Sequence, residues 1–480
     1  MNSDVGAEAR STGSALGPEF SGGSGPWLYT EDGTAWFDGT AGSGAATLGH
    51  QHPEVTAAVT AQAARLAHTG CKLASDVRRR MIERLCALSP YEEPAVLPTA
   101  TGSEAVESAL KIARAATGHR AVVGFRYGFH GKTAGALALT WRAEFKTYSG
   151  YGKDGSGKDG YGKDGYGKDG SGKDGYGKDG SADDGAEGSP PVVIAELPDP
   201  REPGADDVAG FAAGLSAALD AADRRGGTAA VVLEPVQVTE GVLDVPPALL
   251  DEIARQAHSR GALLVLDEIY TGLGRAGRLF TAELMTEKPD LTLLGKTLGN
   301  GFPVGAVVGE RAVLDALPPG VQTSTFSGHP VSCAAAEAVL DIVVREDVAG
   351  RARELGARLR ADLEALAARH PWMRAVRTAG ALAAFDCVRE GRPDPELARA
   401  VTGGALRGRL LLFGGGPEGA TVKIVPPALL DEDGYRFLIE GIGAAVAEAA
   451  RQEEHTGAGR DGGTRHAASH GAPLSEGGRL

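Results

Sequence analysis

The stretch PALLDEIARQAHSRGALLVLDEIYTG, residues 247–272, decides the fold class. Its first part, 247–260, places apolar residues at helical spacing, and Gly261 ends the predicted helix. The residues that follow, 262–266, are all apolar, which is typical of a strand buried on both faces. A helix that leads into such a strand predicts a parallel sheet covered by helices, with ligand chemistry at the carboxyl ends of the strands.

The same alternation continues on both sides of this stretch. An amphipathic helix is predicted at 103–116, and further apolar strands at 121–125, 192–195 and 229–233. After about residue 320 the chain changes to long helices rich in Ala, Leu and Arg, predicted at 334–345, 350–368 and 434–451. We therefore expect an α/β fold with a large, mainly parallel-sheet domain and a smaller α+β domain.

Three segments are too polar or too rich in Gly to build a core. We expect disordered tails at 1–22 and 452–480 and a disordered insert at 149–189, where YGKDG or SGKDG repeats six times from Tyr151. The remaining chain divides into an N-terminal segment, a large domain and a C-terminal small domain, predicted at 23–55, 56–320 and 321–451. The N-terminal segment should form a hairpin, with its turn at Asp32-Gly33, that packs on the small domain.

The composition disfavours several classes of protein. With 49 Lys and Arg against 63 Asp and Glu, the net charge is −14, which argues against nucleic-acid binding. No apolar run is long enough to span a membrane, and the N-terminus does not resemble a secretory signal, so we expect a cytoplasmic protein. The four cysteines lie far apart and form no CxxC pair, so neither a disulfide framework nor a metal site is expected.

Two residues at predicted strand ends stand out as a pair. Asp267 follows the apolar strand 262–266, and Lys296 lies between Leu293-Leu294 and the Gly-rich turn 299–301. Either residue alone is an ordinary strand-end acid or surface lysine. Together they supply a carboxylate that can keep a heterocyclic nitrogen protonated and an amine that can form a Schiff base, the two groups that pyridoxal phosphate chemistry requires.

Seven motifs, in order, resemble those of the class III aminotransferases, the ornithine, 4-aminobutyrate and diaminobutyrate type of pyridoxal-phosphate enzyme. The motifs are LGHQHPEV, TGSEAVESALKIAR, GFHGKT, LEPVQ, LDEIYTGLGRAG, PDLTLLGKTLGNGFPVGAVV and TSTFSGHPVSCAAAEAVL. The resemblance covers residues 25–451 and is interrupted by the YGKDG insert. It implies the fold of the aspartate aminotransferase-like transferases and pyridoxal 5′-phosphate as the cofactor.

The resemblance assigns a role to each matching residue. Lys296 is expected to form the Schiff base with the cofactor and to move the substrate proton. Asp267 is expected to hold the protonated ring nitrogen. Gly102 and Ser103 should hold the phosphate at the start of a helix, with help from the helix dipole.

Three further residues match cofactor contacts of the family: Phe129, His130 and Thr325. Phe129 is expected to stack on the pyridine ring; without the resemblance it would be interpreted as a core phenylalanine. Thr325 matches a threonine that in this family reaches the phosphate of the other subunit's cofactor. The resemblance therefore implies a homodimer with the active site at the subunit interface.

Three positions bear on the substrate. Tyr270 stands where the family usually has a glutamine that touches the ring hydroxyl, so it is expected either to donate a similar hydrogen bond or to clash. Glu234 matches a glutamate that in the family pairs with a substrate-binding arginine, and that arginine is Lys423 here. Because lysine lacks the two-pronged guanidinium, recognition of a carboxylate should be altered or weakened.

The resemblance implies an aminotransferase that moves an amino group from an ω-amine, such as a diamino acid of the diaminobutyrate type, to a 2-oxo acid, 2-oxoglutarate or pyruvate. Two other hypotheses are open. The same fold serves aminomutases, epimerases and decarboxylases, which close their reactions without a 2-oxo acid. A cofactor-binding scaffold without turnover, with the YGKDG insert as a tether, is disfavoured by the intact Lys296, Asp267 and Thr325.

Overall fold

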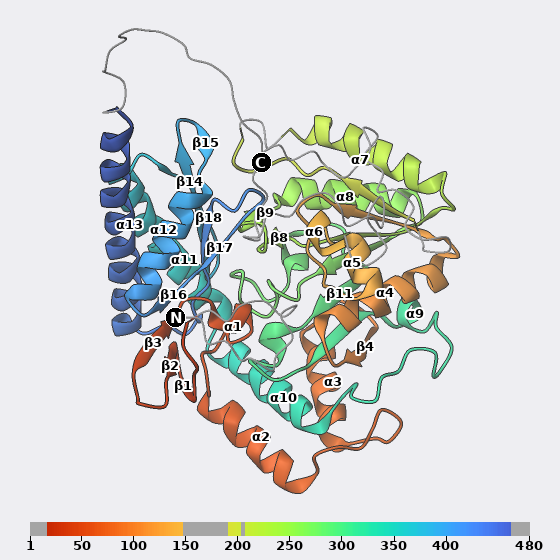
Figure 1. Ribbon diagram of the computed structural model, residues 1–480. Helices are drawn as coiled ribbons and strands as arrows, with labels where there is room; N and C mark the ends of the chain where they lie inside the picture. The colour runs from red at the N-terminus through yellow and green to blue at the C-terminus, as the bar shows by residue number, and fades with distance from the viewer. Residues whose placement is uncertain (1–16, 147–190, 203–206, 462–480) are drawn as a thin grey trace, which may run out of the picture.

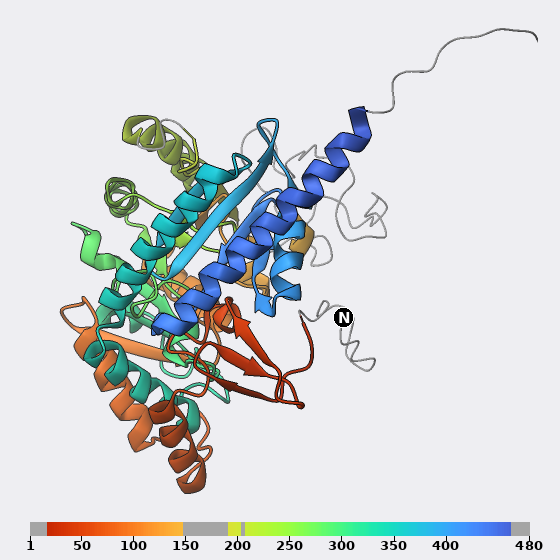
Figure 2. The same ribbon diagram turned by 90° about the vertical axis from the view of Figure 1, so that its left-hand side faces the viewer.

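The computed structural model describes residues 17–146, 191–202 and 207–461, and from residue 453 onwards the backbone alone. The predicted YGKDG insert lies outside the described residues. Figures 1 and 2 show a large sheet flanked by helices beside a smaller sheet and the long C-terminal helix. No helix within the described ranges is long and apolar enough to cross a membrane.

A seven-stranded sheet forms the larger part of the molecule. Its strands, in spatial order, are β4 (Pro94–Thr99), β12 (Gly305–Glu310), β11 (Leu291–Leu294), β10 (Leu263–Asp267), β7 (Thr228–Leu233), β5 (Ala121–Phe125) and β6 (Val192–Ala195). Neighbouring strands pair in parallel except at β12, which runs antiparallel to both β4 and β11. The α/β architecture with a mainly parallel sheet is confirmed, and all four predicted apolar strands are present.

Side chains on the two faces of the sheet explain why these strands are apolar throughout. In β7, Val232 faces a core shared with α4 (Gly102–Thr117), whereas Leu233 faces a second core. That second core includes α7 (Val208–Asp223) and α8 (Pro247–Ser259), which pack on the opposite face of the sheet (Figure 1). Both faces of the central strands are thus buried, and every position along them favours an apolar residue.

A smaller antiparallel sheet lies in the C-terminal part of the chain. Its strands, in spatial order, are β13 (Met373–Ala379), β14 (Leu382–Arg389), β18 (Thr421–Ile424) and β17 (Phe413–Gly415), with β15 (Arg392–Pro393) paired to β14. Helices α11 (Val348–Arg369) and α12 (Pro395–Arg407) pack on this sheet, and α13 (Glu432–Asp461) packs on α12 (Figure 2).

Helix α10 (Pro330–Arg345) contributes to the cores of both parts. Its Leu340 packs with residues of the large sheet, including Val308. Its Val343 packs with residues of the small sheet, including Phe385. Because one helix serves both cores, the domain boundary placed at residue 320 stays a prediction.

The N-terminal segment forms the predicted hairpin. Strands β2 (Trp27–Tyr29) and β3 (Ala35–Asp38) pair antiparallel, between β1 (Gly22–Ser24) and β16 (Leu410–Leu411). The rings of Trp27 and Phe37 lie 4.9 and 5.6 Å from the ring of Phe437 in α13. These aromatic contacts tie the hairpin to the C-terminal helices.

The remaining elements connect these layers. They are α1 (Ala41–Gly44), α2 (Pro53–Arg65), α3 (Asp76–Leu88), α5 (Ala134–Leu139), α6 (Ala143–Lys146), α9 (Arg311–Leu314), η2 (Thr281–Leu284), η3 (Lys296–Leu298), β8 (Val236–Gln237) and β9 (Leu243–Asp244). Helices α2 and α3 pack on α10, the helix that contributes to the cores of both parts.

Both predicted tails are too long. Ser21 already donates its N–H to the carbonyl of Tyr29 over 2.8 Å, so regular structure begins before residue 23. At the other end, α13 continues past the predicted end at 451 to Asp461. The first part of this extension has a physical reason: residues 451–454 are Arg, Gln, Glu and Glu, which are good helix formers and extend an existing helix without any core to pack on.

Candidate active site

The ends of two neighbouring strands form the base of the site. Asp267 is the last residue of β10, and β10 pairs in parallel with β11, which ends two residues before Lys296. Adjacent parallel strands open at the same edge of a sheet, so both side chains reach that edge. Lys296 has a φ of 35°, an unfavourable value for a lysine that indicates a constrained turn.

Lys296 and Asp267 line one cavity of about 190 Å³. The other residues that line it are Thr101, Gly102, Ser103, Phe129, His130, Gly131, Glu234, Ile269 and Tyr270. Eight of the ten predicted site residues are thus brought together. The two that do not line the cavity are Thr325 and Lys423.

Two hydrogen bonds orient the carboxylate of Asp267. His130 donates from Nδ1 to Oδ2 over 2.7 Å, and the N–H of Ile269 donates to Oδ1 over 3.1 Å. Because an ionised carboxylate only accepts, His130 is the donor in this pair. His130 Nε2 is buried and has no partner among the described residues. A buried polar atom without a partner indicates that a polar group belongs beside it.

The start of α4 forms the anion-binding end of the cavity. Thr101 caps the helix by accepting from the N–H of Glu104 over 3.2 Å, and Glu104 accepts from the N–H of Ala100 over 2.7 Å. The N–H groups of Gly102 and Ser103 are first-turn donors, which have no acceptor within the helix. The helix predicted at 103–116 therefore begins one residue earlier, at Gly102, and its cap at Thr101 is a residue that the sequence analysis does not identify.

Two glycines allow the close approach of the segments around this helix end. A Cβ on Gly102 would lie 2.9 Å from the side chain of Ile269, and a Cβ on Gly131 would lie 2.2 Å from Ser103 Oγ. Gly131 also has a φ of 124°, which a residue with a side chain rarely adopts. Larger residues at either position would close the space beside the helix N-terminus.

Burial shifts two ionisable groups of the cavity in opposite directions. It lowers the pKa of Lys296, although the charges of Asp267 and Glu234 oppose this and the charge of Arg275 adds to it. It raises the pKa of Glu234 well above its ordinary value, and the charge of Asp267 raises it further. The N–H of Phe129 donates to Glu234 Oε2 over 2.7 Å. Burial therefore raises the neutral fraction of both groups above what each would have in water.

Lys423 lies beside the cavity, within electrostatic range of Glu234 and Lys296. Its Nζ donates to the carbonyl of Thr239 over 2.9 Å, and burial lowers its pKa to about 8. A two-pronged ion pair lies near it: Arg142 Nε and Nη2 donate to Glu240 over 2.5 and 2.9 Å. No sequence pattern predicts this pair, because its members are far apart in the chain and belong to no recognised motif.

Thr325 is exposed and lies outside the cavity. The neighbouring Phe326 is 57% exposed, and its ring lies 5.1 Å from that of His68. Leu66 and Leu73, on the segment that carries His68, are 39% and 64% exposed. These side chains form an apolar surface next to Thr325, which we call the 66–73/326 patch.

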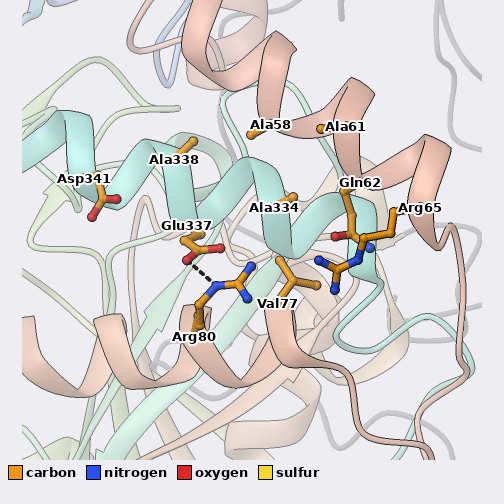
Figure 3. A pocket seen from close by; sticks show the side chains of 10 residues that line it. All are labelled: Ala58, Ala61, Gln62, Arg65, Val77, Arg80, Ala334, Glu337, Ala338 and Asp341. Atoms are coloured by element: carbon orange, nitrogen blue, oxygen red, sulfur yellow. Dashed lines mark hydrogen bonds and ion pairs between the residues drawn. The ribbon is translucent and has the colours of Figure 1, made fainter.

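Two other cavities contain charged side chains that are already in ion pairs. One of about 350 Å³ lies between α2, α3 and α10 and includes four alanines; Arg80 in it pairs with Glu337 over 2.7 Å (Figure 3). Another of about 650 Å³ contains Arg201, which pairs with Asp199. Within the described ranges, no group of three or more His, Cys, Asp or Glu side chains could hold a metal ion.

The residues of the 190 Å³ cavity fit a phosphorylated heterocyclic aldehyde such as pyridoxal phosphate. The first-turn N–H groups of α4 suit a phosphate, and Asp267 suits a protonated ring nitrogen. Phe129 offers an aromatic face, and Lys296 offers an amine whose pKa is lowered. This set of donors matches the requirements of the group without any metal.

The chain is similar in sequence to a known family and to characterised proteins, and similar in structure to solved enzymes. It matches the family Aminotransferase class-III over residues 17–152 and 178–446. It is 31% identical to the 4-aminobutyrate aminotransferase GabT of Escherichia coli K12, over 88% of this chain and 92% of that one. It is 32% identical to the 5-aminovalerate aminotransferase DavT of Pseudomonas putida, over 84% and 88% of the two chains. The crystal structure of ornithine aminotransferase from Toxoplasma gondii matches with a TM-score of 0.76 and 26% identity, over 94% of each chain.

Proposed function

Because the chain belongs to the class III aminotransferase family, we propose that it moves the terminal amino group of an ω-amine, such as a diamino acid of the diaminobutyrate type, to a 2-oxo acid. The protein is an aminotransferase, and its cofactor is pyridoxal 5′-phosphate. The observation that carries the proposal for the site is that Lys296 and Asp267 line one cavity. We propose 2-oxoglutarate or pyruvate as the acceptor.

In the proposed assignment, four features of the cavity hold the cofactor. Lys296 would bear it covalently, and Asp267 would hold the ring nitrogen. The N–H groups of Gly102 and Ser103 would bind the phosphate, and Phe129 would cover the ring face. When bound, the cofactor withdraws electrons from the carbon that carries the amino group.

The chain's own residues supply the proton transfers. Burial lowers the pKa of Lys296, so this amine has a neutral fraction that can accept the proton removed from the substrate carbon. His130 keeps Asp267 oriented through its 2.7 Å hydrogen bond. The walls of the cavity, including Ile269, limit the access of water to the reacting groups.

A lysine beside the cavity supports a substrate that carries a carboxylate. Lys423 lies within electrostatic range of Lys296, and its ammonium can donate to a carboxylate oxygen. The relatives are named for 4-aminobutyrate, 5-aminovalerate and ornithine, each of which has an amino group at the end of the chain opposite its carboxylate. We propose that Lys423 holds that carboxylate while the terminal amine enters the cavity.

A half-reaction screen tests the substrate assignment. Purified enzyme is mixed with single diamines, ω-amino acids and α-amino acids, and the conversion of the cofactor from its aldehyde to its amine form is followed by absorbance. Diaminobutyrate and related ω-amines should convert it, and 2-oxoglutarate or pyruvate should restore it. Turnover that needs no 2-oxo acid would instead assign the protein to the aminomutases, epimerases or decarboxylases.

We propose that the active enzyme is a homodimer with its sites at the interface. Thr325 is exposed beside the 66–73/326 patch, and an exposed apolar surface of this kind is typical of a subunit contact. Light scattering should give twice the monomer mass. Phe326→Asp should shift the protein towards monomer and weaken cofactor retention, whereas a monomeric parent enzyme with full activity would refute the proposal.

A further inference from the structure

Tyr270 lies between the lysine of the site and an unusual turn. Lys296 Nζ lies over the face of the Tyr270 ring, 4.0 Å from its centroid. Among the described residues, no hydrogen bond or ion pair joins this nitrogen to a protein group. The aromatic face is therefore the contact that defines where the amine sits.

The edge of the Tyr270 ring is fixed by α1, a turn of left-handed conformation. All four residues of α1 have positive φ, from 46° at Ala41 to 82° at Gly44. This conformation is unfavourable for Ala41 and Ser43, which have side chains. A Cβ on Gly44 would lie 2.4 Å from Cε1 and 2.8 Å from Oη of Tyr270, so the backbone of the turn touches the ring.

Buried hydrogen bonds hold this strained turn in place. Asp38 accepts from the N–H of Gly42 over 2.8 Å and from the N–H of Thr40 over 2.9 Å. His50 Nε2 lies 2.8 Å from Asp38 Oδ2. Strain persists where the surroundings over-determine it, so the turn acts as a rigid wall behind Tyr270.

We propose that Tyr270 is a positioning residue: the left-handed turn fixes its ring, and the ring face holds the Lys296 amino group inside the cavity. The inference rests on the proposed role of Lys296 as the residue that bears the cofactor. Whenever this nitrogen is not bonded to the cofactor, the ring keeps it within reach of the carbon whose proton it moves. Glutamine at position 270 would offer no aromatic face, so this contact depends on an aromatic side chain at this position.

Four charged groups lie within electrostatic range of Lys296, and Lys423, beside the cavity, is one of them. Asp267 and Glu234 favour its ammonium form, and Arg275, which is completely buried, disfavours it. These groups remain when Tyr270 is replaced by another uncharged side chain. The effect of the aromatic face on the amine can therefore be measured separately from theirs.

The test measures the amine of Lys296 in the full-length chain after the cofactor has been removed. Formaldehyde with a borohydride donor methylates neutral amines, and mass spectrometry quantifies the product at Lys296 across about pH 6 to 10, with the exposed Lys111 as internal reference. Tyr270→Phe keeps the aromatic face, and Tyr270→Met fills similar space without it. Because no cofactor is needed, the result is independent of whether Lys296 binds pyridoxal phosphate, which is tested separately by adding it.

The proposal predicts that Tyr270→Phe follows the parent profile. In Tyr270→Met the midpoint should fall by about one pH unit, a tenfold change in the neutral fraction, because the attraction of the ring for the ammonium is lost. Gly44→Ala, which displaces the ring, should give a downward shift as well and serves as the deciding variant if Tyr270→Met does not fold. The proposal is overturned if Tyr270→Phe and Tyr270→Met have the same midpoint. It is also overturned if the midpoint of Tyr270→Met rises because water enters the site.

Discussion

His130 and Asp267 form a buried hydrogen bond of 2.7 Å in the wall of the cavity. Among the described side chains, no other group forms an ion pair with this carboxylate. The two residues come from separate segments: the loop after β5 and the end of β10. Because the imidazole donates from Nδ1, it fixes the orientation of the carboxylate. A carboxylate held in this way can keep a facing ring nitrogen protonated.

Replacing His130 should impair catalysis without removing the cofactor site. His130→Leu should lower kcat by roughly 10- to 100-fold, because Asp267 loses its side-chain donor and keeps only the N–H of Ile269 to orient it. His130→Asn should recover part of the loss, since a side-chain amide can donate at a similar position. Steady-state kinetics and melting temperature should be measured for both variants. Parent-like kcat in His130→Leu would show that Asp267 needs no donor besides the N–H of Ile269.

Lys296→Ala should abolish both turnover and the visible absorbance of the purified enzyme. The reason is that no other residue lining the cavity has an amine that could bear the cofactor. Lys111→Ala, on the exposed side of α4, is the matched control and should leave both properties unchanged. Spectra and activity with a 2-oxo acid measure the effect, and retained turnover in Lys296→Ala would refute the assignment.

The parts of the site that the sequence predicts are those encoded in short segments. Asp267 and Lys296 each follow an apolar run, and a parallel sheet brings such strand ends to one edge. Gly102 and Ser103 open a helix whose apolar spacing is regular. Local pattern was enough in these cases because each residue's place depends on one element and on its neighbour in the sheet.

Contacts between distant segments could not be predicted in this way. The ion pair of Arg142 with Glu240 and the contact of Gly44 with Tyr270 join segments far apart in the chain. The first depends on how the segment between α5 and α6 meets the turn between β8 and β9, and the second on how the N-terminal segment packs on the large sheet; no local spacing encodes either. The continuation of α13 to Asp461 was missed for the opposite reason, because helix propensity acts without a core.

Lys423 should make the binding of a carboxylate-bearing substrate depend on pH. Its pKa of about 8 means that the ammonium is present below that value and is lost above it. The KM for an ω-amino acid should therefore rise above about pH 8, while the KM for a matched amine without a carboxylate should not.

Two variants separate charge from shape at this position. Lys423→Met should raise the KM for the ω-amino acid roughly 10- to 100-fold below about pH 8, because a charge-assisted hydrogen bond is lost. Lys423→Arg should remove the rise above pH 8, since arginine stays charged. Initial rates across the pH range measure both effects. If Lys423→Met binds the ω-amino acid as the parent does, the carboxylate is held elsewhere.

Glu268 should make the stability of the protein depend on pH. Its carboxyl group is buried and accepts from the N–H and hydroxyl of Thr281, and burial raises its pKa from 4.5 to about 7. The folded state therefore keeps a proton that the unfolded chain releases, so the contribution of Glu268 to stability is complete below about pH 4.5 and is lost as the pH rises to about 7. In Glu268→Gln this loss is absent, and the unfolding free energy relative to the parent should rise by about 3 kcal/mol over that range. Calorimetric melting of this variant and of the exposed control Glu354→Gln checks the expectation, which fails if parent and Glu268→Gln respond to pH in parallel.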